Sequence, residues 1–247
     1  MYHPSFSTIQ LSEMDQVKMM NRTDQKYWFH NDKLSAILEE VQENYFMLDI
    51  EGENLLPYFT VYYDTPENKM YLSHHNGRSN RFKIRRRTYV KSGISFLEIK
   101  HKNNKGRTLK TRMNCSNNYT KFSSEEAEFI ASNSPYKVSD LNPRLINQFT
   151  RLTLVNKNFK ERCTIDFNLQ FKMNSENTQL ENIAIVELKA DGNTELSPLA
   201  KSLRDHRIKS SGFSKYCTGR MLTNSGLKRN LFKTKLRAIN KTNIHQD

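Results

Sequence analysis

Glycine and proline are scarce in this sequence, with 8 and 6 residues among 247. Such low numbers exclude collagen-like and low-complexity architectures, so we expect a chain folded throughout, in one domain or at most two. Three cysteines, far apart and odd in number, give neither a disulfide framework nor a CxxC metal site. No apolar run approaches the roughly 18 to 20 residues of a membrane span, and the N-terminal residues lack a secretion signal. The sequence therefore predicts a cytoplasmic protein.

Acidic residues are also few relative to basic ones. The sequence has 26 Asp and Glu against 39 Lys and Arg, and its formal net charge is +13. An excess of this size is typical of proteins that bind polyanions, with nucleic acid as the first candidate. Where the lysines and arginines lie along the predicted strands indicates which kind of polyanion the protein binds.

Strand-like segments separated by turn-forming residues dominate the sequence. We predict strands over residues 22–30, 58–64, 70–75, 80–89, 94–102, 107–113, 145–155, 161–172 and 182–190. Helices are predicted over residues 31–48, 123–132, 199–208, 213–222 and 227–241. Because strands and helices do not alternate regularly, the expected class is α+β, with a large antiparallel sheet or barrel. The expected divisions are an N-terminal extension (1–21), a main domain (22–222) and a basic C-terminal helix and tail (223–247).

Basic residues alternate with apolar ones along several of these strands. Arg81, Lys83, Arg85 and Arg87 share one face of their strand, and the residues Phe82 and Ile84 face the other way. The same alternation groups Glu98 with Lys100 and Lys102, Lys110 with Arg112, Arg162 with Asp166, and Glu187 with Lys189. For any single strand, a solvated mixed-charge face is an equally good interpretation. Repetition over five strands favours a closed barrel whose basic lumen holds a chain of phosphates.

Nucleic acid fits this pattern less well. A nucleic-acid binder would combine exposed cations with aromatic side chains that stack on bases. Here the cations alternate within strands, and we expect Phe82, Phe96 and Phe167 to point away from them.

Two glutamates lie among the cations, Glu98 in LEIK and Glu187 in VELK. Because a carboxylate repels phosphate, a site meant only for a polyanion should exclude it. The glutamates therefore suggest a divalent metal, which takes oxygen ligands and bridges phosphate oxygens. The alternative, that each glutamate simply pairs with its neighbouring lysine, stays open.

A series of motifs, in order, resembles the VTC domain, the polyphosphate-polymerase branch of the triphosphate tunnel metalloenzymes. These motifs are RTDQKYWF, VYYDT, RFKIRRRTY, FLEIKHK with GRTLKTR, ERCTIDFNLQF, IVELK and GFSKY, and they extend from about Arg22 to Tyr216. The resemblance implies an eight-stranded antiparallel β barrel with flanking helices. It also implies a tunnel that binds triphosphates or polyphosphate with Mn²⁺ or Mg²⁺.

The resemblance implies roles for individual residues. It implies catalytic roles for Arg81, Arg85, Arg87, Lys100, Arg151 and Arg162. It implies substrate binding by Arg22, Lys26, Lys83, Lys102, Lys110, Arg112, Lys189 and Lys215, and metal binding by Glu187 with Glu98. Many relatives begin with Glu-x-Glu-x-Lys, whereas residues 22–26 here read RTDQK. The basic first residue favours the polymerase branch over the hydrolytic one.

We therefore expect metal-dependent phosphoryl transfer, most simply from a nucleoside triphosphate to the end of an inorganic polyphosphate chain. Such transfers depend on positioning and charge neutralisation, so no Ser, His or Cys nucleophile is needed. Two alternatives stay open. One is a hydrolase of the same fold, and the other is a non-catalytic sensor of polyphosphate, inositol phosphates or nucleotides.

Overall fold

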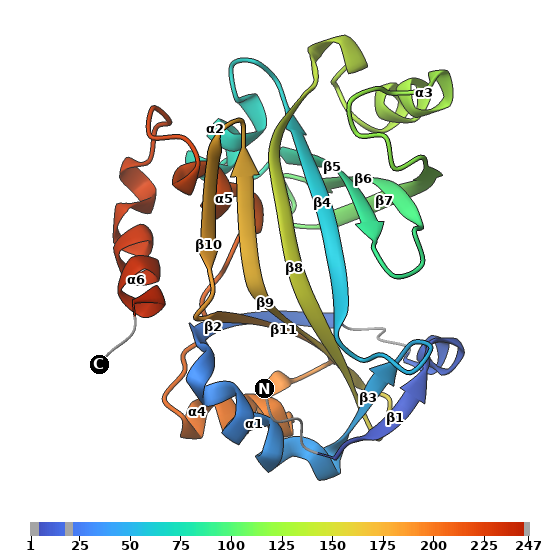
Figure 1. Cartoon of the computed structure of the whole chain (residues 1–247), viewed down its shortest axis with the longest axis vertical. Helices are drawn as coiled ribbons and strands as arrows, with labels where there is room; N and C mark the ends of the chain where they lie inside the picture. The colour runs from blue at the N-terminus through green and yellow to red at the C-terminus, as the bar shows by residue number, and fades with distance from the viewer. Residues whose placement is uncertain (1–4, 18–21, 245–247) are drawn as a thin grey trace.

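A single curved sheet forms the centre of the protein (Figure 1). The computed structural model describes residues 5–17 and 22–244. The eleven strands are β1 Ser7–Gln10, β2 Arg22–His30, β3 Tyr45–Asp49, β4 Leu56–Asp64, β5 Arg81–Tyr89, β6 Ser95–Lys102, β7 Thr108–Cys115, β8 Asn142–Asn156, β9 Glu161–Met173, β10 Glu176–Leu180 and β11 Ile183–Asp191. The main path runs β2-β11-β9-β8-β4-β5-β6-β7 and is antiparallel throughout. β1 pairs in parallel with β3, which joins β8, and β10 pairs with β9.

Six α-helices and several 3₁₀ turns complete the described chain. The helices are α1 Leu34–Val41, α2 Lys69–His75, α3 Ser124–Asn133, α4 Pro198–Asp205, α5 Lys215–Leu222 and α6 Lys233–Asn243. The 3₁₀ turns are η1 Leu11–Gln16, η2 Asn31–Lys33, η3 Gln42–Asn44, η4 Val138–Asp140, η5 Thr194–Leu196 and η6 Asn230–Phe232. Within residues 5–17 and 22–244, no helix is long and apolar enough to cross a membrane.

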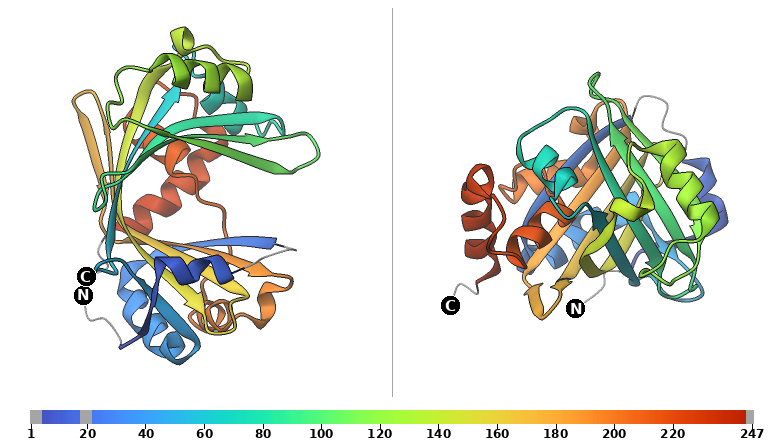
Figure 2. Two further views of the ribbon diagram at one scale, coloured as in Figure 1. Left: turned by 90° about the vertical axis from the view of Figure 1, so that its right-hand side faces the viewer. Right: turned by 90° about the horizontal axis from the view of Figure 1, so that it is seen from above.

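The sheet is C-shaped in cross-section and open on one side (Figure 2, left). β5, β6 and β7 form one arm of the C, and β2, β11 and β9 form the other. Among the described residues no ladder joins the end strands β2 and β7. One cause is that the backbone N–H of Ser211 donates to the Lys26 carbonyl at 2.8 Å, so the segment before α5 occupies part of the β2 edge. The α+β class and antiparallel sheet are confirmed, but the prediction of a closed eight-stranded barrel is wrong.

The convex face of the sheet is covered by helices at both arms. At the β2 arm, α1 and α4 bury an apolar cluster with Ile37, Leu152, Ile165, Val186 and Leu203 at its centre. At the other arm, α2 and α3 contribute Met70 and Ile130 to a cluster with β4, β5 and β6. Apolar residues at every second strand position therefore turn outward here, as the alternation predicts.

The concave face is shared between charged side chains and a second apolar cluster around α5 and α6. This cluster includes Phe171, Ile185, Tyr216 and, from α6, Ile239. α5 lies so close to β8 and β9 that a Cβ atom on Gly219 would sit 2.4 Å from Cδ1 of Phe171. The lumen is therefore only partly basic, because α5 fills part of it. The predicted boundary between the main domain (22–222) and the C-terminal helix and tail (223–247) stays a prediction.

Some elements differ from those predicted. Residues 70–75 form a helix rather than a strand, because the Asp64 carboxylate accepts hydrogen bonds from the N–H groups of Met70 and Tyr71 at 2.9 Å. Those bonds satisfy free donors at the helix N-terminus. The helix predicted over 31–48 ends at Val41, and residues 45–49 are β3. Strands β1 and β10 were not predicted.

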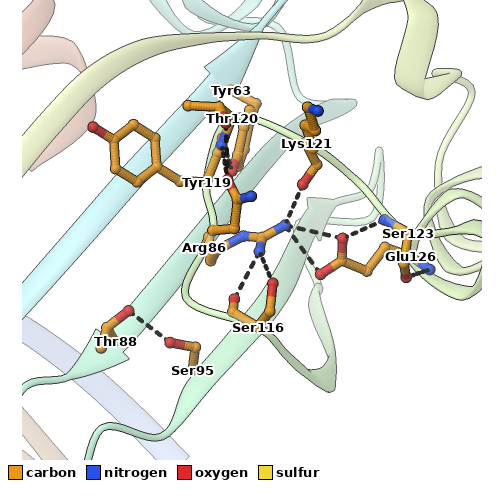
Figure 3. A network of polar contacts seen from close by, with 11 residues as sticks. Tyr63, Arg86, Thr88, Ser95, Ser116, Tyr119, Thr120, Lys121, Ser123 and Glu126 are labelled. Carbon is orange, nitrogen blue, oxygen red and sulfur yellow. Dashed lines mark hydrogen bonds and ion pairs between the residues drawn. The ribbon is translucent and has the colours of Figure 1, made fainter.

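One buried network on the convex face attaches the segment before α3 to β5 (Figure 3). The Arg86 guanidinium donates to the Ser116 carbonyl at 2.7 Å and pairs with the Glu126 carboxylate at 3.0 Å. Glu126 also accepts from the backbone N–H of Ser123, whose hydroxyl accepts in turn from the N–H of Glu126. This capping box starts α3, so a single carboxylate both begins a helix and neutralises a buried arginine.

Candidate functional site: a basic groove on the concave face

The strand register places nearly all the predicted site residues on the concave face. Cross-strand partners share a face, and the register pairs Arg81 with Lys102, Lys83 with Lys100, Arg85 with Glu98, Glu98 with Arg112, Lys100 with Lys110, Arg151 with Asp166, Lys189 with Arg162 and Glu187 with Lys26. Lys215 reaches the same face from α5. Arg22 begins β2, but its side chain lies outside the described part of the structure. We call this surface the basic groove.

The first charged cluster of the basic groove lies at the β5 arm. Arg85 pairs with the Glu98 carboxylate through Nε and Nη2, both at 2.6 Å, and Lys110 pairs with it from the edge strand β7. Burial of Glu98 opposes its ionisation, but Arg85, Arg87 and Lys110 outweigh burial and lower its pKa to about 2. Glu98 is therefore ionised at neutral pH and holds two cations in place.

A second cluster lies where β8 and β9 meet α5. Arg151 binds both carboxylate oxygens of Asp166, at 2.6 and 2.8 Å, and Lys215 pairs with the same carboxylate. Burial opposes ionisation of Asp166, yet Arg151 and Lys215 hold its pKa below the usual range. Lys215 Nζ also lies 4.6 Å from the centre of the Phe149 ring, a cation–π contact. Asp166 thus fixes two cations from elements far apart in sequence.

The third cluster lines the opposite arm. Glu187 pairs with Lys26 at 2.7 Å and with Lys189 at 2.8 Å. Burial opposes its ionisation, but the two lysines hold the pKa of Glu187 well below its usual range. The alternative that each glutamate pairs with its neighbouring lysine therefore holds for Glu187 with Lys189, whereas, in the described part of the chain, Glu98 pairs with Arg85 and Lys110 and not with Lys100.

Arg87 differs from the other deeply placed cations. It is only 7 % exposed, makes no ion pair among the described residues, and its buried Nε has no hydrogen-bond acceptor there. Its guanidinium lies 5.5 Å from the centre of the Tyr58 ring. Burial and repulsion from Arg85 and Arg151 lower the pKa of Arg87, and the charge of Glu98, which is paired with Arg85 and Lys110, offsets them only in part. A buried cation without an anion is costly, so this position suits an anionic ligand.

Lys100 connects the two arms electrostatically. It pairs in register with Lys83 on β5, yet the charges of Glu187 and Lys26 on the other arm also act on its ammonium. The Lys100 residue is exposed, but partial desolvation by the protein around its ammonium and repulsion from Lys26, Lys83 and Arg85 outweigh Glu187 and lower its pKa to about 8. The two arms therefore lie opposite each other across the concave side of the sheet, as the ribbon in Figure 2 shows.

The remaining predicted residues lie around this centre. Lys83 donates to the Ser214 hydroxyl at 3.2 Å, next to α5. Arg81 and Lys102 pair in register at the outer end of the arm, and Arg112 lies on β7 with its guanidinium 4.6 Å from the centre of the Phe96 ring. The buried Nε of Arg162 has no hydrogen-bond acceptor among the described residues. The structure thus brings these residues to one face, with Arg81, Lys102 and Arg112 at its margin.

Aromatic residues of the groove were missed from sequence. Tyr58, Tyr62 and Phe149 lie on the concave face, and Arg151 lies over the first and last of these rings at 5.0 and 5.4 Å. Phe96 was expected to point away from the cations. It pairs with Arg87 in register and shares its face, so that expectation is wrong. Phe96 lies two positions before Glu98 on the same strand, and this spacing alone places the two side chains on the same face.

Glu187 is the carboxylate best suited to a metal ion. Its side chain is 23 % exposed, against 1 % for Glu98. Across residues 5–17 and 22–244, no three His, Cys, Asp or Glu side chains come together as a metal site. Mg²⁺ usually binds through one or two carboxylates, with phosphate oxygens and water completing its shell. The groove residues fit that shared type of site, and the protein would supply only part of the ligand set.

A family model for the VTC domain matches residues 21–224. The chain belongs to the VTC domain family. No curated protein matched the sequence. An adenylate cyclase-like structure from Bacillus halodurans has a TM-score of 0.54 at 12 % identity, covering 79 % of this chain and 96 % of that one. An adenylyl cyclase-like structure from Hippeastrum, reported with a dominant triphosphatase activity, has a TM-score of 0.51 at 13 % identity, covering 86 % and 99 %. These likenesses show that the VTC domain here shares their fold.

Proposed function

We propose that this VTC domain binds the phosphate chain of a nucleoside triphosphate in the basic groove and transfers its terminal phosphoryl group to inorganic polyphosphate. Arg87 carries the proposal, because it is a buried cation between ion-paired clusters and has no carboxylate of its own. A phosphate group would supply the missing negative charge. Family membership supports triphosphates as the ligand class.

The transfer exchanges one phosphorus–oxygen bond for another. A terminal oxygen of the polyphosphate chain forms a bond to the γ-phosphorus, and the bond from that phosphorus to the β,γ-bridging oxygen breaks. The nucleoside diphosphate leaves with the bonding electrons, and the chain grows by one phosphate. Negative charge spreads over the phosphoryl oxygens in the transition state.

Groove residues act on this reaction by holding and neutralising phosphates. Arg85 and Arg151 are held in place by Glu98 and Asp166, so little reorganisation is needed when phosphate arrives. Arg87 would neutralise the phosphate between them, and Lys100 would contact the chain from the β6 side. A divalent metal held by Glu187, with Glu98 contributing, would neutralise further phosphate charge when bound.

The test is incubation of purified protein with ATP, Mn²⁺ and a short inorganic polyphosphate as acceptor, followed by separate assays of acid-labile chain growth and of free phosphate. Wild type should lengthen the chains, and Arg87→Met and Glu187→Gln should each reduce the rate by about 100-fold. Lys201→Ala changes an exposed cation of α4 and serves as the control. Absence of chain growth, or an unchanged rate in Arg87→Met, would overturn the proposal.

Hydrolysis of a triphosphate is the second candidate, favoured by the activity reported for the Hippeastrum protein of similar fold. The same groove would bind the donor, and water would replace the polyphosphate acceptor. Free phosphate without chain growth, lost in Arg87→Met, would assign this reaction to the groove.

A further inference from the structure

A second cavity, of about 630 Å³, lies at the C-terminal end of β2. Its walls come from β2 residues 28–30, the turn after α4, and the C-terminal end of α6. None of the groove cations described above lines it. A cavity of this volume is in the usual range for a small-molecule site. We call it the β2-end pocket.

Basic side chains dominate the rim of the β2-end pocket. Lys33, Arg207, Lys209 and Lys241 line it, against one acidic residue, Asp32. Asp32 lies 3.0 Å from Nδ1 of His30, which also lines the pocket. In the part of the chain that the structure describes, the rim cations Arg207, Lys209 and Lys241 make no ion pair. The pocket therefore has an excess of positive charge that its own residues do not neutralise.

The floor of the pocket contains an indole ring. Trp28 is the only tryptophan in the chain, and it contacts Phe213 edge-on with ring centres 6.1 Å apart. Its Nε1 is buried and has no hydrogen-bond acceptor among the described residues. Ile208 also lines the pocket, as does Ile244, which is 66 % exposed. The pocket thus offers apolar contact beside its cations, which a bare phosphate would not use.

The backbone of Arg207 supports a role for its side chain. Arg207 has φ of 61°, in the left-handed region, directly after the helix end at α4. The N–H of Arg207 donates to the Arg204 carbonyl and that of Ile208 to the Leu203 carbonyl, both at 2.8 Å. Glycine or asparagine usually occupies this position because other side chains are strained there. The strained position nevertheless carries an arginine that lines the pocket.

We propose that the β2-end pocket binds a phosphorylated ring compound of the nucleotide class, separately from the basic groove. The phosphates would contact the cations at the rim, and the ring would lie against the apolar and aromatic residues that line the pocket. The inference does not rest on the proposed phosphoryl transfer, since it uses none of the groove cations.

Trp28 allows a direct test, because it is the only tryptophan of the sequence and it lines this pocket. All tryptophan fluorescence of the protein therefore comes from a ring at this site. Groove binding could also reach Trp28 through β2, so the titration with ATP is done in an Arg87→Met background. We expect the emission of Trp28 to change with ATP there. Adding Arg207→Glu and Lys241→Glu should weaken the apparent affinity at least about tenfold. Lys105→Glu, an exposed cation in the turn between β6 and β7, is the matched charge control.

The outcomes separate this site from the groove. A response to ATP that persists in Arg87→Met, is lost with the two rim substitutions and survives in Lys105→Glu supports the pocket. A response lost in Arg87→Met alone, or equally weakened by Lys105→Glu, would overturn it. Inorganic tripolyphosphate is the second probe. Equal affinity for tripolyphosphate and ATP would overturn the ring-binding part, whereas preference for ATP supports it. Far-ultraviolet circular dichroism checks that each variant is folded.

Discussion

The guanidinium groups of Arg86 and Arg87 lie on opposite faces of β5, although the two residues are adjacent in sequence. Arg86 is 1 % exposed and pairs with the Glu126 carboxylate on the convex face (Figure 3). Arg87 lies on the concave face without a carboxylate. The same residue type therefore stabilises the fold at position 86 and provides a positive charge, unpaired among the described residues, for a ligand at position 87.

Arg86→Met should destabilise the protein strongly. The substitution leaves the buried Glu126 carboxylate without its cation, and breaking a buried pair in this way costs roughly 3–5 kcal/mol. Urea unfolding followed by circular dichroism would measure the loss in unfolding free energy. The double variant Arg86→Met/Glu126→Gln should recover part of it, because no buried charge is then left alone. Equal stability of wild type and Arg86→Met would contradict the structural role.

Arg87→Met should have the opposite profile. Among the described residues no hydrogen-bonded ion pair is broken, although the buried Glu98 carboxylate loses one of the three cations that lower its pKa. Repulsion between Arg87 and the cations Arg85 and Arg151 falls at the same time, so the unfolding free energy should change far less than in Arg86→Met. Affinity for inorganic tripolyphosphate should fall at least about tenfold, since a charge-assisted contact is removed. Isothermal titration calorimetry measures the affinity, with Lys201→Ala, at an exposed position of α4, as the control. A large loss of stability with unchanged affinity would refute the assignment.

The alternation of charge along strands was sufficient to predict most of the groove. Side chains alternate faces whatever the distant contacts are, so spacing alone groups the charged residues of each strand, such as Arg85 with Arg87 and Glu187 with Lys189, on one face of that strand. Arg86 occupies the other face by the same rule, but its partner Glu126 lies 40 residues away in sequence. Spacing within one strand carries no information about such a contact.

Closure of the sheet could not be predicted in this way. Whether β2 and β7 meet depends on curvature added over the whole sheet and on what occupies each edge. The segment containing Ser211 takes part of the β2 edge, and α5 fills the concave side. Residues 70–75 were also ambiguous, because the Asp64 carboxylate that starts α2 precedes the helix by several residues. Whether a short apolar segment forms a helix or a strand is decided by such tertiary contacts.

Lys100 should make phosphate binding depend on pH above neutrality. A lysine is charged below its pKa, and the value of about 8 means that Lys100 loses its charge between about pH 7 and 9 rather than near the ordinary 10.5. Tripolyphosphate affinity should therefore weaken over this range. Arginine stays charged, so Lys100→Arg should retain more affinity at pH 9. The ratio of the two dissociation constants cancels the titration of the ligand itself, and a ratio independent of pH would rule out this role for Lys100.

Gly219→Ala should weaken both the fold and the groove. Alanine raises intrinsic helix propensity by about 1 kcal/mol in an exposed helix. Here the added Cβ would lie 2.4 Å from Cδ1 of Phe171 and 2.6 Å from Cδ2 of Leu145, so α5 or its neighbours must move. Such overpacking costs roughly 1–3 kcal/mol and should outweigh the propensity gain. Urea unfolding should show a net loss of stability, whereas Asn240→Ala on the exposed face of α6 should show none.

The same substitution should reach the groove through Lys215, which lies one turn before Gly219 on α5 and pairs with Asp166. If α5 moves away from β8 and β9, the lysine moves with it, and tripolyphosphate affinity should fall. Leu145→Val removes both δ carbons that the new methyl group meets, at 2.6 and 3.0 Å, so Gly219→Ala/Leu145→Val should recover part of both the stability and the affinity. Recovery of stability without affinity would show that α5 only supports the fold, and a Gly219→Ala variant more stable than wild type would show that the close contact with β8 and β9 does not exist.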